Sequence, residues 1–375
     1  MNITRITPYV VQQSLDQPFY FSQWQYDTRT ICLVKIETDT GLCGWGEGYG
    51  PAAVIRAGID FFSPFLLGMD ALAHENVWQT MYRRSLDYAR RGVLVAAISA
   101  IDIALWDIKG KALNLPVSTL LGGRKREAVT PYATGMYFTE GKGLTQRLAD
   151  EAQGYAEQGF QAMKMKVGLN LKDDLANMKA VRQAIGDEID LMIDANHAYS
   201  LREATQLAQA VEPLNIGWFE EPVSPEEYDN YRQLRSKTTI PIAGGECEYL
   251  RYGFQQLFQQ QSVDIAQPDI CATGGLTEAK KVATMAQTYG VAVVPHSWGT
   301  GIAVATALHF ISNLEITPGR RQPPPAFIEL DRTENDLRDK LVSPQFVPTD
   351  GELTVPSGSG LGIEVDEDLL QHFSQ

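Results

Sequence analysis

Ionisable side chains end a series of short apolar runs in the second half of the chain, at intervals of 23 to 33 residues. Each run is a predicted strand, and each interval is about the length of one strand–helix unit. Because the carboxyl ends of parallel strands meet at one end of a barrel, we expect these side chains to face one another. They are Lys166, Asp194, Glu220, Glu246, Asp269, His296 and Glu329.

Two lysines, Lys164 and Lys166, close the first of these strands. Side chains two positions apart on a strand point the same way. The alternative, a solvated pair on an edge strand, does not suit a central parallel strand, where ammonium groups need opposing carboxylates. We expect each lysine to lower the pKa of the other through like-charge repulsion, which makes a base available near neutral pH.

Three carboxylates, Asp194, Glu220 and Glu246, end adjacent predicted strands. They repel one another unless a cation binds, and hard oxygen ligands suit Mg²⁺, with Mn²⁺ as a substitute. The alternative is three separate helix caps or surface ion pairs. Glu221 rivals Glu220, but alternation from Phe219, an expected outward position, favours Glu220 inward.

Asp269 and His296 end neighbouring predicted strands and form a candidate dyad, in which the carboxylate orients the imidazole and raises its basicity. His197 is a weaker candidate for substrate contact, and His309 lies in an apolar helical pattern typical of a structural histidine. Lysine and histidine bases on opposite sides of a metal indicate removal of a proton α to a carboxylate, with the enediolate stabilised on the metal.

The elements that position these groups alternate between strands and helices after Arg126, which favours a closed parallel barrel over an open doubly wound sheet. No Gly-x-Gly-x-x-Gly follows a strand, which argues against nucleotide binding. The predicted strands are 129–132, 162–167, 189–193, 216–219, 240–243, 263–265, 291–294 and 326–330. The predicted helices are 143–158, 171–185, 201–211, 225–236 and 277–289.

The first 125 residues read as an α+β unit. Strands are predicted over 30–38 and 42–47, and helical periodicity follows over 52–110. Between them and the amino terminus lies an aromatic segment, 14–28, which we interpret either as a loop packed on the sheet or as a mobile lid over a pocket. The tail after residue 330 is expected to return to this unit.

Composition limits the classes of function. A chain of 375 residues suggests about two domains. Its formal net charge of −14 argues against binding to nucleic acid or an anionic membrane. Four scattered cysteines without a Cys-x-x-Cys pair, the absence of a signal-peptide pattern and the interrupted apolar stretch 93–108 predict a reduced, cytoplasmic protein without a membrane span.

With these motifs the chain resembles the mandelate racemase subgroup of the enolase superfamily. The segments that carry the resemblance are Gly44–Glu47, Ile101–Asp107, Lys-x-Lys, Asp-Ala-Asn, Glu-Glu-Pro, Gly-Glu, Gln-Pro-Asp and Pro-His. The resemblance implies an α/β fold with a TIM-like (β/α)7β barrel over 126–330, an α+β capping domain over 1–125 and a tail, 331–375, that completes the capping domain. It also implies a homo-oligomer of two to eight chains.

The resemblance assigns roles as well. It makes Lys166 and His296 the bases, places Lys164 on the substrate carboxylate, and has Asp269 support His296. Glu329 would hydrogen-bond the enediolate. The metal ligands would be Asp194, Glu220 and Glu246, and further substrate contacts are expected from Asn196, His197, Trp298, Tyr20, Trp24 and Tyr49.

Several segments look most like D-galactarolactone cycloisomerases, namely 194–199, 243–246, 295–301 and 329–333. That resemblance implies opening of a sugar-acid lactone by β-elimination to a 3-deoxy-2-keto acid. Two alternatives stay open, a dehydratase acting on an open-chain sugar acid and a non-catalytic barrel, while a racemase is less favoured. The specificity is expected to lie in the lid, 19–29, and in the loop near Tyr49.

Overall fold

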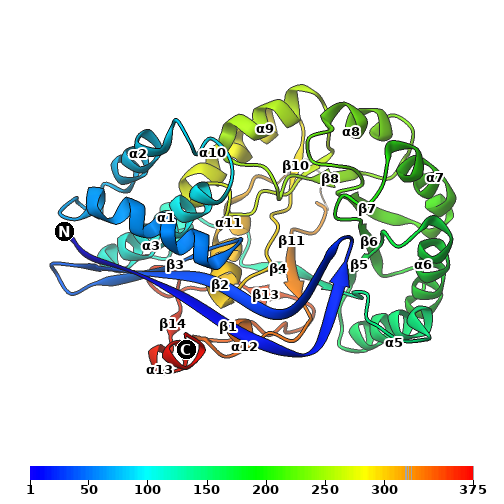
Figure 1. The fold of residues 1–375 in the computed structure, drawn as a ribbon, viewed down its shortest axis with the longest axis horizontal. Helices are drawn as coiled ribbons and strands as arrows, with labels where there is room; N and C mark the ends of the chain where they lie inside the picture. Colours follow the sequence, from blue (N-terminus) through cyan, green and yellow to red (C-terminus); the bar gives the residue numbers. More distant parts are fainter. Residues whose placement is uncertain (317–318, 320, 322, 375) are drawn as a thin grey trace.

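The computed structural model describes residues 1–316, 319, 321 and 323–374, and its elements run from a mixed N-terminal unit into a ring of strands and helices (Figure 1). The N-terminal sheet is antiparallel, with β1 (Ile3–Phe21), β2 (Trp24–Thr38) and β3 (Cys43–Gly48) in that order. Its helices are α1 (Ala52–Leu66), α2 (His74–Ser85) and α3 (Val93–Leu113), followed by the short α4 (Val117–Leu120).

Parallel strands alternate with helices through the second unit. The strands are β4 (Ala128–Gly135), β5 (Ala162–Lys166), β6 (Asp190–Asp194), β7 (Ile216–Glu220), β8 (Ile242–Gly244), β9 (Ile265–Ala266), β10 (Ala292–Val293) and β11 (Phe327–Asp331). The helices between them are α5 (Leu144–Glu157), α6 (Leu171–Ile185), α7 (Leu201–Val211), α8 (Tyr228–Arg235), α9 (Leu250–Gln259), α10 (Gly275–Thr288) and α11 (Gly301–Asn313). The strands pair in the order β10-β9-β8-β7-β6-β5-β4-β11, which confirms the predicted (β/α)7β barrel.

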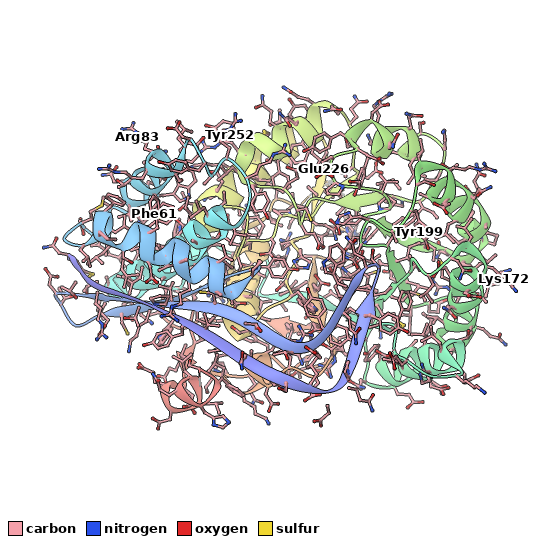
Figure 2. The ribbon with its side chains drawn as sticks, in the orientation of Figure 1. Phe61, Arg83, Lys172, Tyr199, Glu226 and Tyr252 are labelled. Atoms are coloured by element: carbon pink, nitrogen blue, oxygen red, sulfur yellow. The ribbon has the colours of Figure 1, made fainter. Side chains whose placement is uncertain are left out.

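Alternation along the strands separates two cores. Met163 and Met165 pack outward against the helices, whereas the interior of the barrel is floored by Tyr132, Ala162, Met192, Trp218 and Ala243. Figure 2 shows Tyr199 inside the ring of helices, as part of the outer core, and Lys172 on the outer surface of the ring. Because the floor is a buried hydrophobic cluster, the polar positions one step further along β5, β6 and β7 are confined to the open end of the barrel.

The aromatic segment 14–28 is not a loop, as one interpretation had it. It forms the far ends of β1 and β2, which pair as a hairpin through Phe21 and Trp24 around a turn at Ser22 and Gln23. The hairpin reaches away from the N-terminal unit to the barrel near β5 (Figure 1). Alternating aromatic and polar residues extend an antiparallel ladder as readily as they fill a loop.

The tail touches both units. It contains α12 (Asp336–Asp339), β12 (Val342–Ser343), β13 (Leu353–Thr354), β14 (Glu364–Val365) and α13 (Glu367–Phe373). β13 pairs antiparallel with β4, while Glu367 forms an ion pair with Lys35 of β2 at 2.5 Å. The domain boundaries at 125/126 and 330/331 stay a prediction.

Buried carboxylates of the N-terminal unit join it to the barrel. Glu47 accepts hydrogen bonds from the backbone N–H of Thr300 (3.0 Å) and from its hydroxyl (2.6 Å), at the start of α11. Asp102 accepts from the backbone N–H of Thr277 (2.9 Å) and its hydroxyl (2.6 Å), at the start of α10. At Gly299 a Cβ would lie 2.0 Å from Glu47 Oε1, so only glycine admits this contact.

Among the helices that the structure describes, a search for one both long and apolar enough to cross a membrane finds none.

Candidate active site

Lys164 lies at the centre of the polar end of the barrel and is 1% exposed. Its ammonium group forms a close ion pair with Glu220 and lies 3.0 Å from Glu329 and 3.6 Å from Asp194. Burial opposes the charge, but these carboxylates outweigh it and raise the pKa of Lys164 well above its usual value. The expectation that like-charge repulsion lowers this pKa is therefore wrong for Lys164. The attraction of the nearby carboxylates outweighs any repulsion from Lys166.

Lys166 lies one step further out on β5, toward the hairpin. Its Nζ donates to Asp194 Oδ2 at 2.5 Å and to Asn196 Oδ1 at 2.8 Å. The ring of Phe21, at the tip of the hairpin, lies 4.7 Å from the same nitrogen. The tip therefore covers Lys166, which is 5% exposed.

Glu220 projects from β7 on the same face as Trp218, whose indole N–H donates to Glu220 Oε2 at 2.9 Å. Gln267 donates to the same oxygen at 2.5 Å. Burial, together with the negative charges of Asp194, Glu329 and Glu246, raises the pKa of Glu220 to about 7, although Lys164 opposes the shift. The negative charges around this carboxylate therefore outnumber the positive charges that could stabilise it.

His296 stands across the barrel mouth from the lysines. Its Nδ1 lies 2.6 Å from Asp269 Oδ2, and its Nε2 lies 3.6 Å from Glu246 and 3.9 Å from Glu329. Burial opposes the charge on the ring, but Glu246, Glu329 and Asp269 outweigh it and raise the pKa of His296 to about 10. The imidazole is thus held protonated near neutral pH and can donate a proton.

The donor set fits a divalent cation. Carboxylates outnumber cationic groups at this end of the barrel, and their repulsion adds to burial in raising the pKa of Glu220. Hard oxygen ligands in that excess suit Mg²⁺ or Mn²⁺. In this structure Lys164 Nζ lies beside Glu220 and Lys166 Nζ lies beside Asp194, so oxygens of both carboxylates are turned to lysine nitrogens.

An aromatic cluster forms the underside of the hairpin. Its members, from β1, β2 and two barrel loops, are Leu15, Phe19, Phe21, Tyr26, Tyr137 and Trp298. Arg29, 2% exposed, lies 4.0 Å from the centre of the Trp298 ring and forms an ion pair with Asp331 at 2.6 Å. The hairpin is thereby fastened to the end of β11.

Of the predicted substrate-contacting residues, Tyr49, Trp298 and Trp24 contact other side chains near the site, whereas Tyr20 points away from it. Tyr49 packs on the His296 ring with centroids 5.0 Å apart, and Trp298 donates its indole N–H to Tyr137 at 3.1 Å. Trp24, 39% exposed, meets the His197 ring edge-on. Tyr20 instead donates its hydroxyl to the Thr139 carbonyl at 3.3 Å, on the opposite face of β1 from Phe19 and Phe21. The roles of all these residues stay proposals.

Several side chains that bind this set escaped the sequence analysis. Trp218 and Gln267 both donate to Glu220, and Thr134 donates to Glu329 at 2.7 Å. Trp218 was within reach, since alternation from Glu220 places it on the inner face. Thr134 and Arg29 carried no such signal, because their partners lie 195 and 302 residues away.

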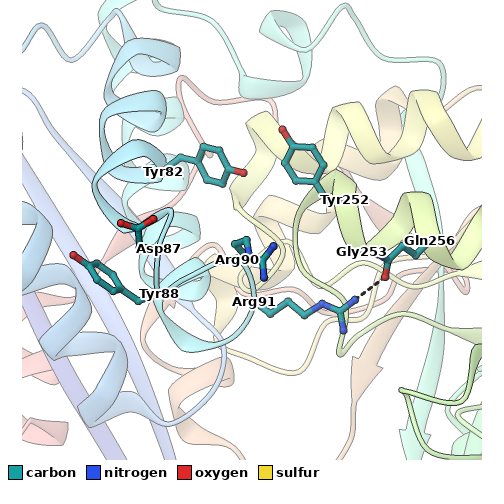
Figure 3. Close-up of a pocket in the computed structure, with 8 residues that line it drawn as sticks. All are labelled: Tyr82, Asp87, Tyr88, Arg90, Arg91, Tyr252, Gly253 and Gln256. Carbon is teal, nitrogen blue, oxygen red and sulfur yellow. Dashed lines mark hydrogen bonds between the residues drawn. The ribbon is translucent and has the colours of Figure 1, made fainter.

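A separate surface pocket lies between the loop after α2 and helix α9 (Figure 3). Its lining includes Tyr82, Tyr88 and Tyr252, and Arg91 donates to Gln256 at 3.0 Å. None of its lining residues belongs to the strand-end set.

Models of known families match both units. The model of the mandelate racemase/muconate lactonizing enzyme N-terminal domain matches residues 5–122, and that of the enolase C-terminal domain-like family matches residues 147–369. The chain belongs to the enolase superfamily. This confirms the resemblance read from the motifs, and the chain is an enzyme of that superfamily.

Relatives within the superfamily match over the full length. The crystal structure of the 3,6-anhydro-D-galactonate cycloisomerase from Zobellia galactanivorans is 57% identical, with a TM-score of 0.92 and complete coverage of both chains. A D-galactarolactone cycloisomerase of Agrobacterium fabrum is 42% identical over 100% of this chain and 99% of its own. An arabinonate dehydratase of Saccharolobus solfataricus is 35% identical over 92% and 90%.

A structure with a metal is among the superfamily matches. The structure of a racemase from Streptomyces coelicolor A3(2) with bound magnesium is 27% identical, with a TM-score of 0.88 and complete coverage of both chains.

Proposed function

We propose that this enzyme opens the oxygen ring of a 3,6-anhydro sugar acid, with 3,6-anhydro-D-galactonate as the substrate. The reaction class is inferred from one observation. Lys166 and the His296–Asp269 dyad lie on opposite sides of the cluster of buried carboxylates at the open end of the barrel. The full-length similarity at 57% identity supports the substrate.

In the proposed reaction, Lys166 as the neutral amine removes the proton from C2, the carbon α to the substrate carboxylate, and Lys164 is the proposed partner of that carboxylate. The electron pair left on C2 expels the ether oxygen from C3, and this C3–O bond is the one that breaks. The ring oxygen takes a proton and becomes the C6 hydroxyl. The resulting enol then gains a proton at C3 and loses the proton of its C2 hydroxyl, which becomes the keto group, so the product is a 3-deoxy-2-keto acid of the same mass.

His296 is the proposed acid. An ether oxygen leaves as an alkoxide, which is a poor leaving group and needs a proton in the transition state. The raised pKa of His296 keeps that proton available. A lactone expels a carboxylate, which needs little help, so opening of the anhydro ring should depend on His296 much more than opening of the galactarolactone expected from the sequence.

Asp194, Glu220 and Glu246 are the proposed holders of Mg²⁺. When bound, the metal supplies a Lewis acid that stabilises negative charge on the substrate carboxylate. Glu329, which lies 3.0 Å from Lys164, would hydrogen-bond the carboxylate side of the intermediate. Mn²⁺ is expected to substitute.

The test is turnover of 3,6-anhydro-D-galactonate with Mg²⁺ in D₂O, followed by NMR and mass spectrometry. We expect a 3-deoxy-2-keto product with deuterium at C3 and, in H₂O, no change in mass. A product lighter by one water would mean that a dehydratase reaction takes place instead. The proposal would be overturned if the substrate is not consumed and no deuterium from the solvent enters it.

D-galactarolactone is the second candidate substrate, on the strength of the relative at 42% identity. Each substrate gives a product of its own mass, so the type of reaction does not distinguish them. The values of kcat/KM for the two substrates, measured with the same enzyme, decide between them. An acid-impaired His296→Asn variant should lose much more rate with the ether than with the lactone. Assembly from two to eight chains and a cytoplasmic location stay predictions, to be checked by light scattering and by localisation.

A further inference from the structure

A histidine, a glutamate and a cysteine come together just beyond the proposed magnesium ligands. They are His197, Glu221 and Cys247, which follow the ends of β6, β7 and β8. Their ligand atoms all lie within 4.8 Å of one another. Among the described residues, no other group of three His, Cys, Asp or Glu side chains brings its ligand atoms this close together. The proposed reaction uses neither Glu221 nor Cys247.

The distances match the edges of a tetrahedron around a zinc ion. His197 Nε2 lies 3.1 Å from Glu221 Oε2 and 3.6 Å from Cys247 Sγ. With ordinary zinc bond lengths of about 2.0 Å to nitrogen or oxygen and about 2.3 Å to sulfur, a tetrahedral ion would set these separations at about 3.3 and about 3.5 Å. The two separations from His197 are therefore close to those that one tetrahedral ion requires, and the third ligand pair, Glu221 and Cys247, lies within 4.8 Å.

The surroundings prepare the histidine for this role. Its Nδ1 lies 3.2 Å from the Val223 carbonyl, which can only accept, so Nδ1 carries a hydrogen and Nε2 is the nitrogen that faces Glu221 and Cys247. Metal-binding histidines commonly donate their second N–H in this way. The backbone N–H of His197 also donates to the Glu221 carbonyl at 2.8 Å, which fixes the two residues relative to each other.

Burial and access complete the site. Glu221 is 1% exposed and its side chain also accepts from Asn196 at 3.4 Å, while Cys247 is exposed and gives an ion a route from solvent. Nitrogen and sulfur ligands select Zn²⁺ and similar soft ions over Mg²⁺, which prefers oxygen.

We propose that His197, Glu221 and Cys247 form a second metal site that binds one Zn²⁺ or a similar thiophilic ion, separate from the proposed magnesium site. On binding, the Cys247 thiol forms its bond to the metal through sulfur and releases its proton to solvent. Three protein ligands leave the fourth tetrahedral position to water. The ion ties together the loops after three adjacent barrel strands.

The experiment uses Cd²⁺ as the spectroscopic probe, added to the full-length enzyme in the presence of saturating Mg²⁺. We expect a near-ultraviolet thiolate-to-cadmium band that saturates at one equivalent in the wild type. Cys247→Ser should lose the band, and Cys43→Ser, the matched control at a half-exposed cysteine outside the triad, should keep it. Absence of the band from the wild type, or its survival in Cys247→Ser, would overturn the proposal.

A second measurement needs no variant. One equivalent of Zn²⁺ in excess Mg²⁺ should slow alkylation of Cys247 by iodoacetamide at least about tenfold, because a metal-bound thiolate is withdrawn from reaction. Alkylation of Cys43, followed by peptide mass spectrometry in the same sample, should be unchanged. Equal rates at Cys247 with and without Zn²⁺ would show that no ion binds there.

Discussion

Buried carboxylates occur in two regions of this enzyme, at the joint between its units and at the open end of the barrel. Burial raises the pKa of Glu47 and Asp102 at the joint to about 7, and Glu220 in the barrel reaches about 7 as well. The partners differ. The joint carboxylates accept from backbone N–H groups and threonine hydroxyls, whereas Glu220 also faces an ammonium group and other carboxylates.

The difference separates the two carboxylates at the joint from Glu220, a proposed metal ligand. Backbone donors at helix starts satisfy Glu47 and Asp102 in place, and no added cation is needed. The carboxylates around Glu220 exceed the positive charge available, which is a reason to bind a metal. Burial and a raised pKa alone therefore do not mark a catalytic group, and the kind of partner does.

The largest effect is expected from the two proton-transfer groups. Lys166→Met or His296→Asn should lower kcat by roughly 10²–10⁴, because each removes a group that moves a proton in the transition state. Asp102→Asn, at the joint, should stay within a few fold of the wild type. Steady-state kinetics with Mg²⁺, on variants shown to be folded by circular dichroism, checks this. Comparable losses at Lys166 and Asp102 would erase the distinction.

Substitutions at the open end of the barrel, and not those at the joint, should change the affinity for Mg²⁺. Glu220→Gln removes a negative ligand, and we expect magnesium affinity to fall roughly tenfold or more. Chelation should abolish turnover of the wild type, and Mg²⁺ or Mn²⁺ should restore it. Isothermal titration calorimetry with Mg²⁺ measures the affinity, and Glu47→Gln serves as the matched control. Full turnover in excess chelator would remove the metal from the proposal.

Stability should respond to the other region. Glu47→Gln replaces an acceptor of several hydrogen bonds with an amide that presents N–H groups to the start of α11, and should cost about 1–3 kcal/mol of the free energy of unfolding. Denaturant unfolding in Mg²⁺ gives the value. A variant as stable as the wild type would show that the joint does not depend on these bonds.

Arg29 tests the hairpin that connects the two regions. Arg29→Lys keeps a positive charge near Asp331 but loses the planar group that stacks on Trp298. We expect KM to rise several-fold with a smaller change in kcat, since the hairpin covers the site without moving a proton. A fall in kcat as large as that of His296→Asn would place Arg29 in the chemical step.

Much of the barrel was predictable from the sequence, because seven ionisable groups at strand–helix intervals could arise only from a repeated unit. The helix 171–185 and the helix 201–211 have the predicted bounds, since their apolar periodicity is regular and Asn170 and Ser200 cap them. Alternation also predicted Glu220 on the inner face of β7, where the structure has it beside Trp218.

Other features depended on contacts that no local pattern carries. The hairpin that includes Phe21 was interpreted as a loop or a lid, because its strands are held partly by aromatic contacts with Tyr137 and Trp298 from the barrel. The raised pKa of Lys164 was missed, since it depends on how close Glu220 and then Glu329 come from other strands. The joint of Glu47 with α11 spans 253 residues and has no sequence signature of its own.

The smallest effect concerns the pH dependence of stability. The pKa of Asp102 is about 7 in the folded enzyme, against an ordinary value of 3.8, because burial outweighs its hydrogen bonds from Thr277. Between these two values the folded state holds a proton that the unfolded state has lost. Stability from this group is therefore fully present below about pH 4 and is lost as the pH rises through about 7.

Asp102→Asn carries no such proton, so its stability relative to the wild type should improve as the pH rises. From about pH 5 to about pH 7.5 we expect the gap between the two proteins to narrow by on the order of 1 kcal/mol, less than the full pKa difference allows because local relaxation offsets part of it. Urea unfolding of both proteins at the two pH values, in the same Mg²⁺, measures the gap, and contributions from Glu220 cancel because both proteins contain it. A gap that stays constant or widens would show that Asp102 is ionised in the folded enzyme, with Thr277 and the start of α10 stabilising its charge in full.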